Sequence, residues 1–454
     1  SLQESLNARA GRLALLRDTT VQGHDVFGVA GAPTVVVCDR EARVQAFKVG
    51  HDPQIGEFLP ALVGELLAGR NPAGELRRVV AEEAAVYQRR LAAALLENAS
   101  DLIALPTVKL QPARDPAQLR MRTLWTTREI ASPGNILVID GPQGAQILVH
   151  DHAKDWRTLV VLTPEGKVVE RRSLPVPSTA AVALLRSAED ADGRRWYVGS
   201  ARLAKQAYVF DDRWQLHAAF PPEGTPHEGI SDFQLVDFKG DGQLQLCVGF
   251  WGLLGVHGAG LDGQGQWVNR QLSPIVSLAV SPPNEAGWRR LLATSDQGQL
   301  LAINAFGKHD PPKQVGQYAI THLFASSFTG PQDATYMGVA ALVDGSPVGV
   351  PLSATLDALD WELPLAAGTH QNQIQWAISG DVLGGKTGQW IFAAPDGTIG
   401  LVAADASFAD SFSLGEELTG VAVAQVGNRP ALLVATKTSV RAIELLRRAG
   451  PAPR

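Results

Sequence analysis

Short apolar segments alternate with turn residues from about residue 120 to the C-terminus, and they recur in groups of four. The groups repeat about every 40–48 residues, and their many β-branched side chains are typical of strands in an all-β repeat fold. The first group comprises residues 135–140, 146–150, 158–163 and 167–171. Five further groups of four begin near residues 179, 232, 275, 320 and 374, and three segments remain at 418–424, 431–436 and 439–444.

This strand count indicates a closed ring. Residues 120–129 form a spare strand before the first group, and the last group lacks one strand. Pairing the spare strand with the incomplete group removes two open sheet edges. The sequence therefore predicts an all-β propeller of seven four-stranded blades, with the N-terminal strand closing the last blade. Six or eight blades stay open as alternatives because the fifth group, 320–363, is irregularly spaced.

The first seventy residues have a different, α/β pattern. Thr34–Cys38 is apolar throughout, as expected of a buried strand, so Cys38 is expected to be a buried, unreactive thiol. Arg43–Val49 alternates like the partner strand of a hairpin. Ile55–Ala68 has helical periodicity and ends at Gly69, a residue suited to a C-cap.

The two patterns divide the chain into four parts. Residues 1–70 form a partial α/β domain, and 71–119 form a helical linker with an irregular segment. Residues 120–447 form the propeller, and 448–454 form a flexible tail. The linker is expected to be helical because residues 75–98 are rich in Ala, Leu, Glu and Arg.

Composition narrows the possible functions. The 454 residues carry 40 Lys and Arg against 46 Asp and Glu, and a net charge of −6 argues against nucleic-acid binding by a broad basic face. No apolar run reaches the roughly 18 residues of a membrane span. Two cysteines, Cys38 and Cys247, cannot form a disulfide framework, a four-cysteine zinc site or a CxxC pair. Because the sequence starts at Ser1 without Met, we expect a processed chain or a fragment.

The stretch Phe27-Gly-Val-Ala-Gly-Ala-Pro-Thr-Val-Val-Val-Cys-Asp, followed by a turn and Ala46-Phe-Lys-Val-Gly, resembles the C-terminal half of a thioredoxin-like domain of the redoxin type. In that family the proline of this loop is cis, and the residue before it pairs through its backbone with extended substrate. The resemblance implies a cis Pro33 and a substrate-binding role for Ala32 and Pro33.

The redoxin CxxC motif precedes this region in the family, at a helix N-terminus that favours the reactive thiolate. No CxxC is present in this sequence. Either the first strand and the active-site helix are missing by truncation, or residues 1–70 are a redox-dead half-domain. We favour truncation, because a sheet without a core strand exposes a long apolar edge. A separate polypeptide that supplies the missing part would also fit.

The stretch Asp237-Phe-Lys-Gly-Asp-Gly resembles the turn of FG-GAP and VCBS-type propeller repeats. Asp-rich loops of some relatives bind Ca²⁺, because hard cations prefer several carboxylates. This loop has Asp237 and Asp241, whereas Lys239 stands where a further carboxylate would be. We expect a plain Asp-Gly turn, with Ca²⁺ binding as the open alternative. No metal site and no cofactor are predicted.

Other candidate sites are less specific. His150 and His152 share one strand face like two metal ligands, but no third ligand is identifiable, so a solvated turn is favoured. The loop Pro226–Gly229 precedes an inner strand, where propeller loops can line a ligand site. The ten Trp residues fit blade packing better than a sugar-binding platform. A Gly-x-Ser-x-Gly nucleophile motif is absent.

Two functions from different classes follow. The redoxin resemblance implies that the parent protein is a bacterial thiol–disulfide oxidoreductase outside the cytoplasm, in the periplasm or secreted, with the propeller as a partner- or ligand-binding platform. The alternative is a non-enzymatic propeller scaffold that binds a protein partner through a propeller face. A propeller hydrolase or lyase is a weaker third hypothesis, because no convergent acid–base set is visible and fold alone does not decide function.

Overall fold

The computed structural model describes residues 34–38, 43–49, 55–70, 109–141, 144–153, 155–326, 328, 333–341, 347–366, 375–385, 387–394 and 396–448. The chain divides into two compact units, Ser1–Tyr87 and Gln88–Arg454. None of the described helices is long and apolar enough to cross a membrane.

The described part of the first unit is a hairpin followed by one helix. Strand β1 (Thr34–Cys38) pairs antiparallel with β2 (Val44–Val49), and helix α3 (Ile55–Leu67) follows. Gly69, with a φ of 73°, ends the helix, because Arg70 N–H donates to Glu65 O and Gly69 N–H to Leu66 O. These elements do not by themselves show a thioredoxin-like α/β fold.

The expectation that Cys38 is buried is wrong. The Cys38 side chain is exposed, whereas Cys247 in the propeller is buried. Cys38 is the last residue of β1, and the pairing register with β2 shifts between Val37 and Cys38. Val35, Val36 and Val37 are half-buried, so the apolar run did not specify a fully buried strand.

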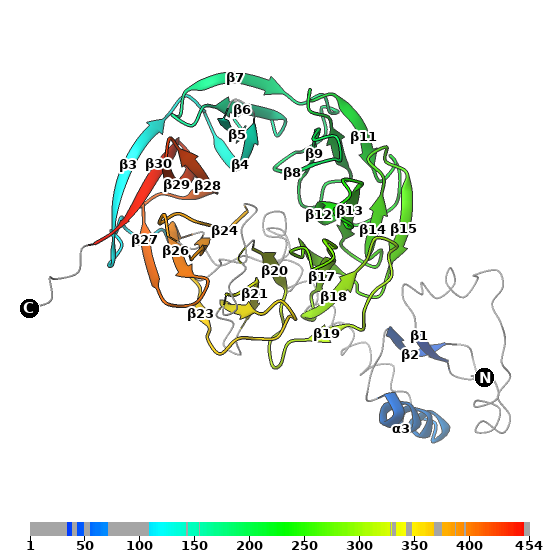
Figure 1. Cartoon of the computed structure of the whole chain (residues 1–454). Helices are drawn as coiled ribbons and strands as arrows, with labels where there is room; N and C mark the ends of the chain where they lie inside the picture. The colour runs from blue at the N-terminus through cyan, green and yellow to red at the C-terminus, as the bar shows by residue number, and fades with distance from the viewer. Residues whose placement is uncertain are drawn as a thin grey trace, which may run out of the picture. The chain divides into compact units, whose positions relative to one another are not determined.

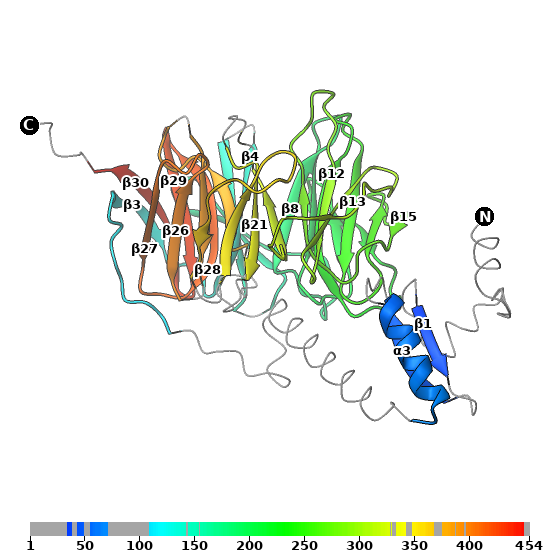
Figure 2. The same cartoon turned by 90° about the horizontal axis from the view of Figure 1, so that it is seen from below.

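The second unit is a ring of seven four-stranded antiparallel sheets (Figure 1). The prediction of a seven-bladed, all-β propeller with four-stranded blades is confirmed. The innermost strand of each blade lines the centre of the ring, and the fourth strand lies at the rim. Figure 2 shows this ring from the side, with its loops gathered at the two ends of the strands.

The first four blades follow each other along the chain. The first blade is β4 (Pro133–Gly141), β5 (Gly144–Asp151), β6 (Thr158–Leu162) and β7 (Val168–Ser173). The second is β8 (Leu184–Glu189), β9 (Arg195–Ser200), β10 (Ala207–Phe210) and β11 (Leu216–Phe220). The third is β12 (Ile230–Asp237), β13 (Leu244–Phe250), β14 (Val256–Ala259) and β15 (Gly265–Asn269). The fourth is β16 (Ile275–Val280), β17 (Leu291–Ser295), β18 (Gln299–Ile303) and β19 (Lys313–Gln314).

The remaining blades complete the ring. The fifth blade is β20 (His322–Ala325), β21 (Tyr336–Ala341), β22 (Pro347–Leu352) and β23 (Leu363–Pro364). The sixth is β24 (Ala377–Gly380), β25 (Gln389–Ala393), β26 (Thr398–Ala403) and β27 (Ala409–Ser413). The seventh is β28 (Leu418–Val426), β29 (Arg429–Thr436) and β30 (Ser439–Arg447), together with β3 (Leu119–Thr127).

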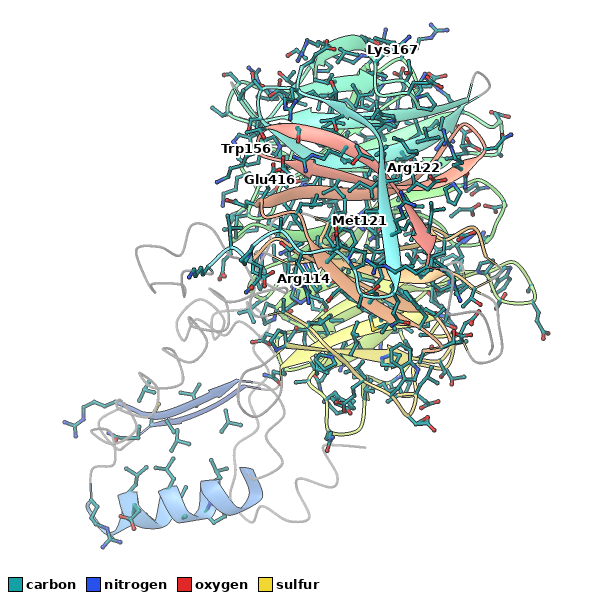
Figure 3. All side chains as sticks on the ribbon, turned by 90° about the vertical axis from the view of Figure 1, so that its left-hand side faces the viewer. Arg114, Met121, Arg122, Trp156, Lys167 and Glu416 are labelled. Carbon is teal, nitrogen blue, oxygen red and sulfur yellow. The ribbon has the colours of Figure 1, made fainter. Side chains whose placement is uncertain are left out.

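The two ends of the propeller close the seventh blade together. Strand β3 pairs antiparallel with β30, from Leu119 opposite Arg447 to Thr127 opposite Val440. Figure 3 shows β3 with Met121 and Arg122 beside the last strands of the chain. Arg122 adds an ion pair to Glu444 of β30. In this way β30 is paired on both sides, and β3 becomes the outermost strand of that blade.

The core lies between neighbouring blades. Leu184, Trp196 and Val198 of the second blade, for example, pack in one cluster with Phe233 and Leu246 of the third. Such strands are buried on both faces, which explains why their sequences are continuous apolar runs. Three tryptophans, Trp251, Trp376 and Trp390, are fully buried in the propeller, as blade packing requires.

Some strands do not begin or end where the sequence pattern predicts. The second group, expected to begin near residue 179, begins at β8, Leu184–Glu189, and Val182 and Ala183 are buried in the preceding loop. The last strand of the fifth group is only Leu363–Pro364, and Leu359 N–H donates to Pro351 O before it. Apolar loop residues that pack on a core give the same local pattern as a strand.

Candidate functional site: a loop basin between the second and third blades

Three loops at one end of the propeller enclose a hollow of about 600 Å³, called the basin below. They are the loop before β8, the loop between β9 and β10, and the loop before β12. In antiparallel blades, connections between blades and those between second and third strands emerge at the same end. We call this end the basin face. The residues that define the basin are Pro177, Thr179, Leu203, Lys205, Tyr208, Glu223 and His227, among others.

Hydrogen bonds join two of these loops firmly. Leu203 N–H donates to Ile230 O at 2.8 Å, and Ile230 N–H donates to Ala204 O at 3.0 Å. The Lys205 ammonium donates to His227 O at 2.9 Å, and His227 Nε2–H donates back to Lys205 O at 3.0 Å. The basin is therefore shaped before any ligand arrives, which lowers the entropy cost of binding.

Gly229 permits the close approach of these loops. Its φ is 138°, and a Cβ placed there would lie 2.7 Å from Leu203 Cα. Only glycine tolerates both the dihedral angle and the contact.

The basin is mostly apolar, with opposite charges on its lining. Prolines and alanines form much of its wall, and Tyr208 lies buried within it. Burial, followed by the nearby Glu223 carboxylate, raises the pKa of Tyr208, so this hydroxyl stays protonated. The Tyr208 hydroxyl lies 3.4 Å from Gln206 Oε1. Lys205 and Glu223 supply one positive and one negative charge.

The basin's hydrogen-bonding groups favour binding over acid–base chemistry. Burial lowers the pKa of His227 and favours its neutral form, and Nε2–H is committed to the Lys205 carbonyl. The Thr225 hydroxyl donates to Pro222 O at 2.7 Å. Neither group is arranged as a base beside a nucleophile.

The central channel holds a second hollow of about 350 Å³, crossed by a polar network. Arg186 on β8 donates to Phe233 O at 2.9 Å, to Gln375 Oε1 at 3.0 Å and to Asp232 Oδ1 at 3.1 Å. The other Asp232 oxygen accepts Leu278 N–H at 2.8 Å. Arg186 therefore links the second blade to the third, and through Gln375 to the segment before the sixth.

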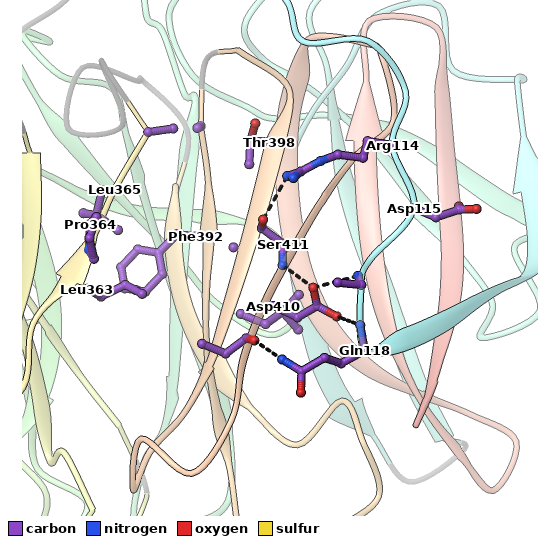
Figure 4. Close-up of a pocket in the computed structure, with 16 residues that line it drawn as sticks. Arg114, Asp115, Gln118, Leu363, Pro364, Leu365, Phe392, Thr398, Asp410 and Ser411 are labelled. Carbon is purple, nitrogen blue, oxygen red and sulfur yellow. Dashed lines mark hydrogen bonds between the residues drawn. The ribbon is translucent and has the colours of Figure 1, made fainter. Parts of the chain in front are cut away.

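A third hollow, of about 630 Å³, lies beside the outer strands of the fifth and sixth blades (Figure 4). Leu363, Phe392 and Leu401 supply apolar lining, whereas Arg114 and Asp410 supply charge. Arg114 donates to Ser411 Oγ at 2.9 Å. Pro364 lacks an N–H at the edge of β23, which disfavours addition of another strand there.

Asp410 ties the segment before β3 to the sixth blade at this hollow (Figure 4). Its Oδ1 accepts Ala117 N–H at 2.9 Å, and its Oδ2 accepts Gln118 N–H at 2.8 Å and Leu119 N–H at 3.1 Å. Arg114 and Ser413 exchange backbone hydrogen bonds nearby. This hollow is a structural seam, so the basin is the stronger candidate for ligand recognition.

The residues predicted from sequence fall into different parts of the chain. Ala32 and Pro33 lie outside the described residues, so their expected substrate-binding role is not tested. The loop Pro226–Gly229, one of the less specific candidates from the sequence, contributes Pro226 and His227 to the basin. Leu203, Lys205, Tyr208 and Glu223 were missed, because they come from the loop between β9 and β10, from β10 itself and from the loop before β12, and no local motif marks them.

The Asp237 loop is a turn built by its own carboxylate. Asp237 Oδ1 accepts Gly240 N–H at 2.8 Å, and Oδ2 accepts Gly242 N–H at 2.9 Å. Asp241 Oδ1 accepts Gln243 N–H at 3.0 Å. Among the described residues, no group of three or more His, Cys, Asp and Glu side chains is placed to hold a metal ion.

His150 and His152 are packed in the protein rather than lying in a solvated turn. His150 is 2 % exposed, its ring centroid lies 5.8 Å from that of His152, and His152 lies 4.0 Å from the Trp156 ring. Burial lowers the pKa of His150 to about 3 and that of His152 to about 4. The nearby His152 ring also lowers the His150 pKa, whereas the Asp151 carboxylate opposes the shift of His152.

We expect these histidines to make the propeller less stable in mild acid. Their pKa values in the folded protein lie below the ordinary 6.5. At pH values between the folded and the ordinary pKa, the unfolded chain therefore binds more protons than the folded protein. This part of the stability is fully present well above pH 6.5 and is lost as the pH falls, by about 2 kcal/mol for each of the two histidines between pH 7 and 5. Urea unfolding of wild type and His150→Leu at both pH values measures this loss. Replacing the exposed His309 in the same way is the control, and equal pH dependence in all three proteins would contradict the expectation.

No family model matches the chain, so the resemblances to redoxin domains and to FG-GAP and VCBS repeats gain no support from that comparison. No curated protein matches it either.

Solved structures show the fold. A crystal structure of BBS1N in complex with ARL6DN, soaked with lead, has a TM-score of 0.51 and 16 % identity, and the match covers 75 % of this chain and 99 % of that one. A streptogramin B lyase structure has a TM-score of 0.47 and 13 % identity, with 72 % and 98 % covered. The similarity to BBS1N agrees with the ring of blades described above, and this chain is a seven-bladed β-propeller protein.

Proposed function

We propose that the propeller is a protein-recognition platform and that the basin binds an extended segment of the partner. The observation that carries this proposal is the basin's pre-formed, mostly apolar shape between loops joined by the Lys205–His227 hydrogen bonds. Its volume lies within the roughly 300–1,000 Å³ of ligand pockets. BBS1N, which has a similar fold, was crystallised in complex with ARL6DN, so a protein partner is consistent with this architecture.

The lining indicates the kind of segment that fits. Tyr208, Leu203 and the prolines favour apolar side chains at the centre of the segment. Lys205 and Glu223 favour a carboxylate and a cation on its two flanks, because complementary charges fix orientation and register.

We expect that filling the basin abolishes binding of such segments. Peptides selected from a random display library against the full chain should bind wild type, and Thr179→Trp should weaken them at least about 10-fold by occupying the basin. Ser178→Trp is the matched control, because Ser178 is exposed and does not line the basin. Failure to select any peptide, or equal affinities for both variants, would contradict the proposal.

A second candidate function is thiol–disulfide exchange by the parent protein, outside the cytoplasm. The supporting observation is that β1, β2 and α3 follow in the order expected for the C-terminal half of a redoxin domain. The intact mass and thiol count of the natural protein test it. A mass well above 48.3 kDa with two further thiols released by reduction supports an upstream CxxC. A matching mass with Cys38 and Cys247 as the sole thiols favours the non-enzymatic scaffold.

A further inference from the structure

A hydroxyl group and a carboxamide group lie next to each other in the lining of the basin. Tyr208, on β10, and Gln206, two residues before it, both line the basin. The Tyr208 ring packs in one core cluster with Val176 and Val182, which holds its hydroxyl end in place. The Gln206 amide is also held, because its Nε2–H donates to Pro221 O at 2.9 Å. The pair is therefore ordered before a partner arrives.

The two groups satisfy each other poorly. The Tyr208 hydroxyl oxygen lies 3.4 Å from Gln206 Oε1, whereas an O–H···O hydrogen bond is usually about 2.5–3.0 Å long. The bond from Gln206 Nε2–H to Pro221 O leaves Oε1 as the free acceptor of this amide. A good donor, the hydroxyl, and a good acceptor, Oε1, therefore stand side by side for a ligand.

A segment that fills the basin has to bond to both groups. In the free protein, water can serve the hydroxyl and Oε1 through the opening of the basin. A purely apolar segment would exclude that water and leave one donor and one acceptor unsatisfied, which weakens binding about 10-fold or more. The pair therefore selects segments that carry a matching acceptor and donor.

The charges of the basin disfavour a charged ligand group at this point. Burial, followed by the Glu223 carboxylate, raises the pKa of Tyr208, so the hydroxyl stays protonated and can donate. A ligand carboxylate would meet both Glu223 and the lone pairs of Gln206 Oε1, and it has no N–H to donate. A ligand ammonium has no acceptor for Tyr208. Lys205 and Glu223 are exposed, and burial lowers the pKa of His227, which favours its neutral form.

A primary carboxamide matches the pair. It presents a C=O acceptor and an N–H donor along one edge. A backbone peptide group is trans, so its C=O and N–H point in opposite directions, and a single one cannot meet both Tyr208 and Gln206. In the matching arrangement the Tyr208 hydroxyl donates to the ligand carbonyl oxygen, and a ligand N–H donates to Gln206 Oε1.

We propose that Tyr208 and Gln206 recognise the side-chain carboxamide of an asparagine or glutamine in the segment that occupies the basin. This inference rests on the proposed function of the basin, and it makes Tyr208 a specificity-determining residue of that site. Leu203 and the prolines of the lining contact the apolar residues on either side of the carboxamide.

Peptides selected from a random display library against the full chain are the probes. We expect the selected sequences to share an asparagine or glutamine between apolar residues. Replacing this residue of the peptide with leucine should weaken binding to wild type about 10-fold or more, because the hydroxyl and Oε1 then lose their partners. Isothermal titration calorimetry of the two peptides measures the change.

A double-mutant cycle links the peptide's carboxamide to Tyr208. Tyr208→Phe removes the hydroxyl alone, so it should weaken the carboxamide peptide about 10-fold and change the affinity of the leucine peptide little. A merely structural role of Tyr208 would weaken both peptides alike. Tyr197→Phe is the matched control, because Tyr197 is buried on the neighbouring strand β9 and does not line the basin. Its affinities for both peptides should equal those of wild type.

Failure of this inference can be distinguished from failure of the proposed function. If Thr179→Trp abolishes binding but the peptides share no carboxamide, the basin is the recognition site and the carboxamide assignment is wrong. The same conclusion follows if Tyr208→Phe weakens the carboxamide and leucine peptides equally. If Thr179→Trp leaves binding unchanged, the basin is not the site and both proposals fall.

Discussion

Replacing Asp410 with alanine is expected to lower the free energy of unfolding by about 2–3 kcal/mol, although this carboxylate lies near the surface. Its two oxygens accept N–H groups from Ala117, Gln118 and Leu119, where the chain enters the closing strand. Hydrogen bonds to a charged acceptor are stronger than neutral ones, and the substitution removes three together. The loss should appear in urea unfolding and in faster amide exchange of β3.

Asp405→Ala is the matched control for this prediction. Asp405 lies in the same blade but bonds within its own turn, to Ser407. We expect its replacement to cost less than about 1 kcal/mol, because the altered turn is local and exposed. Equal losses in the two variants would show that Asp410 has no special part in ring closure.

Replacing Arg186 with leucine is expected to cost about 2–4 kcal/mol. The Asp232 carboxylate would remain in the channel without its cation, and breaking a buried ion pair from one side is costly. The expected loss is at the lower end of the range for broken buried ion pairs, because the Arg186 and Asp232 side chains are still 22 % and 13 % exposed. Arg186→Lys should recover only part of the loss, since lysine lacks the guanidinium's planar fork of donors.

A double-mutant cycle isolates the Arg186–Asp232 interaction. Asp232→Asn in the Arg186→Leu background removes the uncompensated charge, so the double variant should be at least about 1 kcal/mol more stable than additivity predicts. Urea unfolding of the four proteins gives this coupling. Strict additivity would mean that the channel network does not join the blades energetically.

The blades could be predicted from sequence because each strand carries its own local signal. Val160–Leu162 of β6 and Leu432–Val434 of β29 are buried on both strand faces, so the apolar run itself specifies the strand. Ring closure could be predicted by counting strands. The strand now called β3 had no group of its own in the nearby sequence, and the last group lacked one strand. The loop at Val182 and the end of β1 at Cys38 were misjudged because an apolar run does not reveal the packing around it.

The basin was only partly predictable. His227 was singled out because it precedes an inner strand, and loops there meet at one end of a propeller. Lys205 lies on another loop, and a tertiary hydrogen bond to His227 O brings the two together.

Hydrogen–deuterium exchange of the full chain with and without a selected peptide tests the central claim that the basin is the recognition site. We predict slower amide exchange in residues 201–206 and 221–230 when the peptide is bound, with little change in residues 281–290 and 304–310. Protection confined to the opposite end of the propeller, or to the hollow around Asp410, would contradict the assignment of the basin.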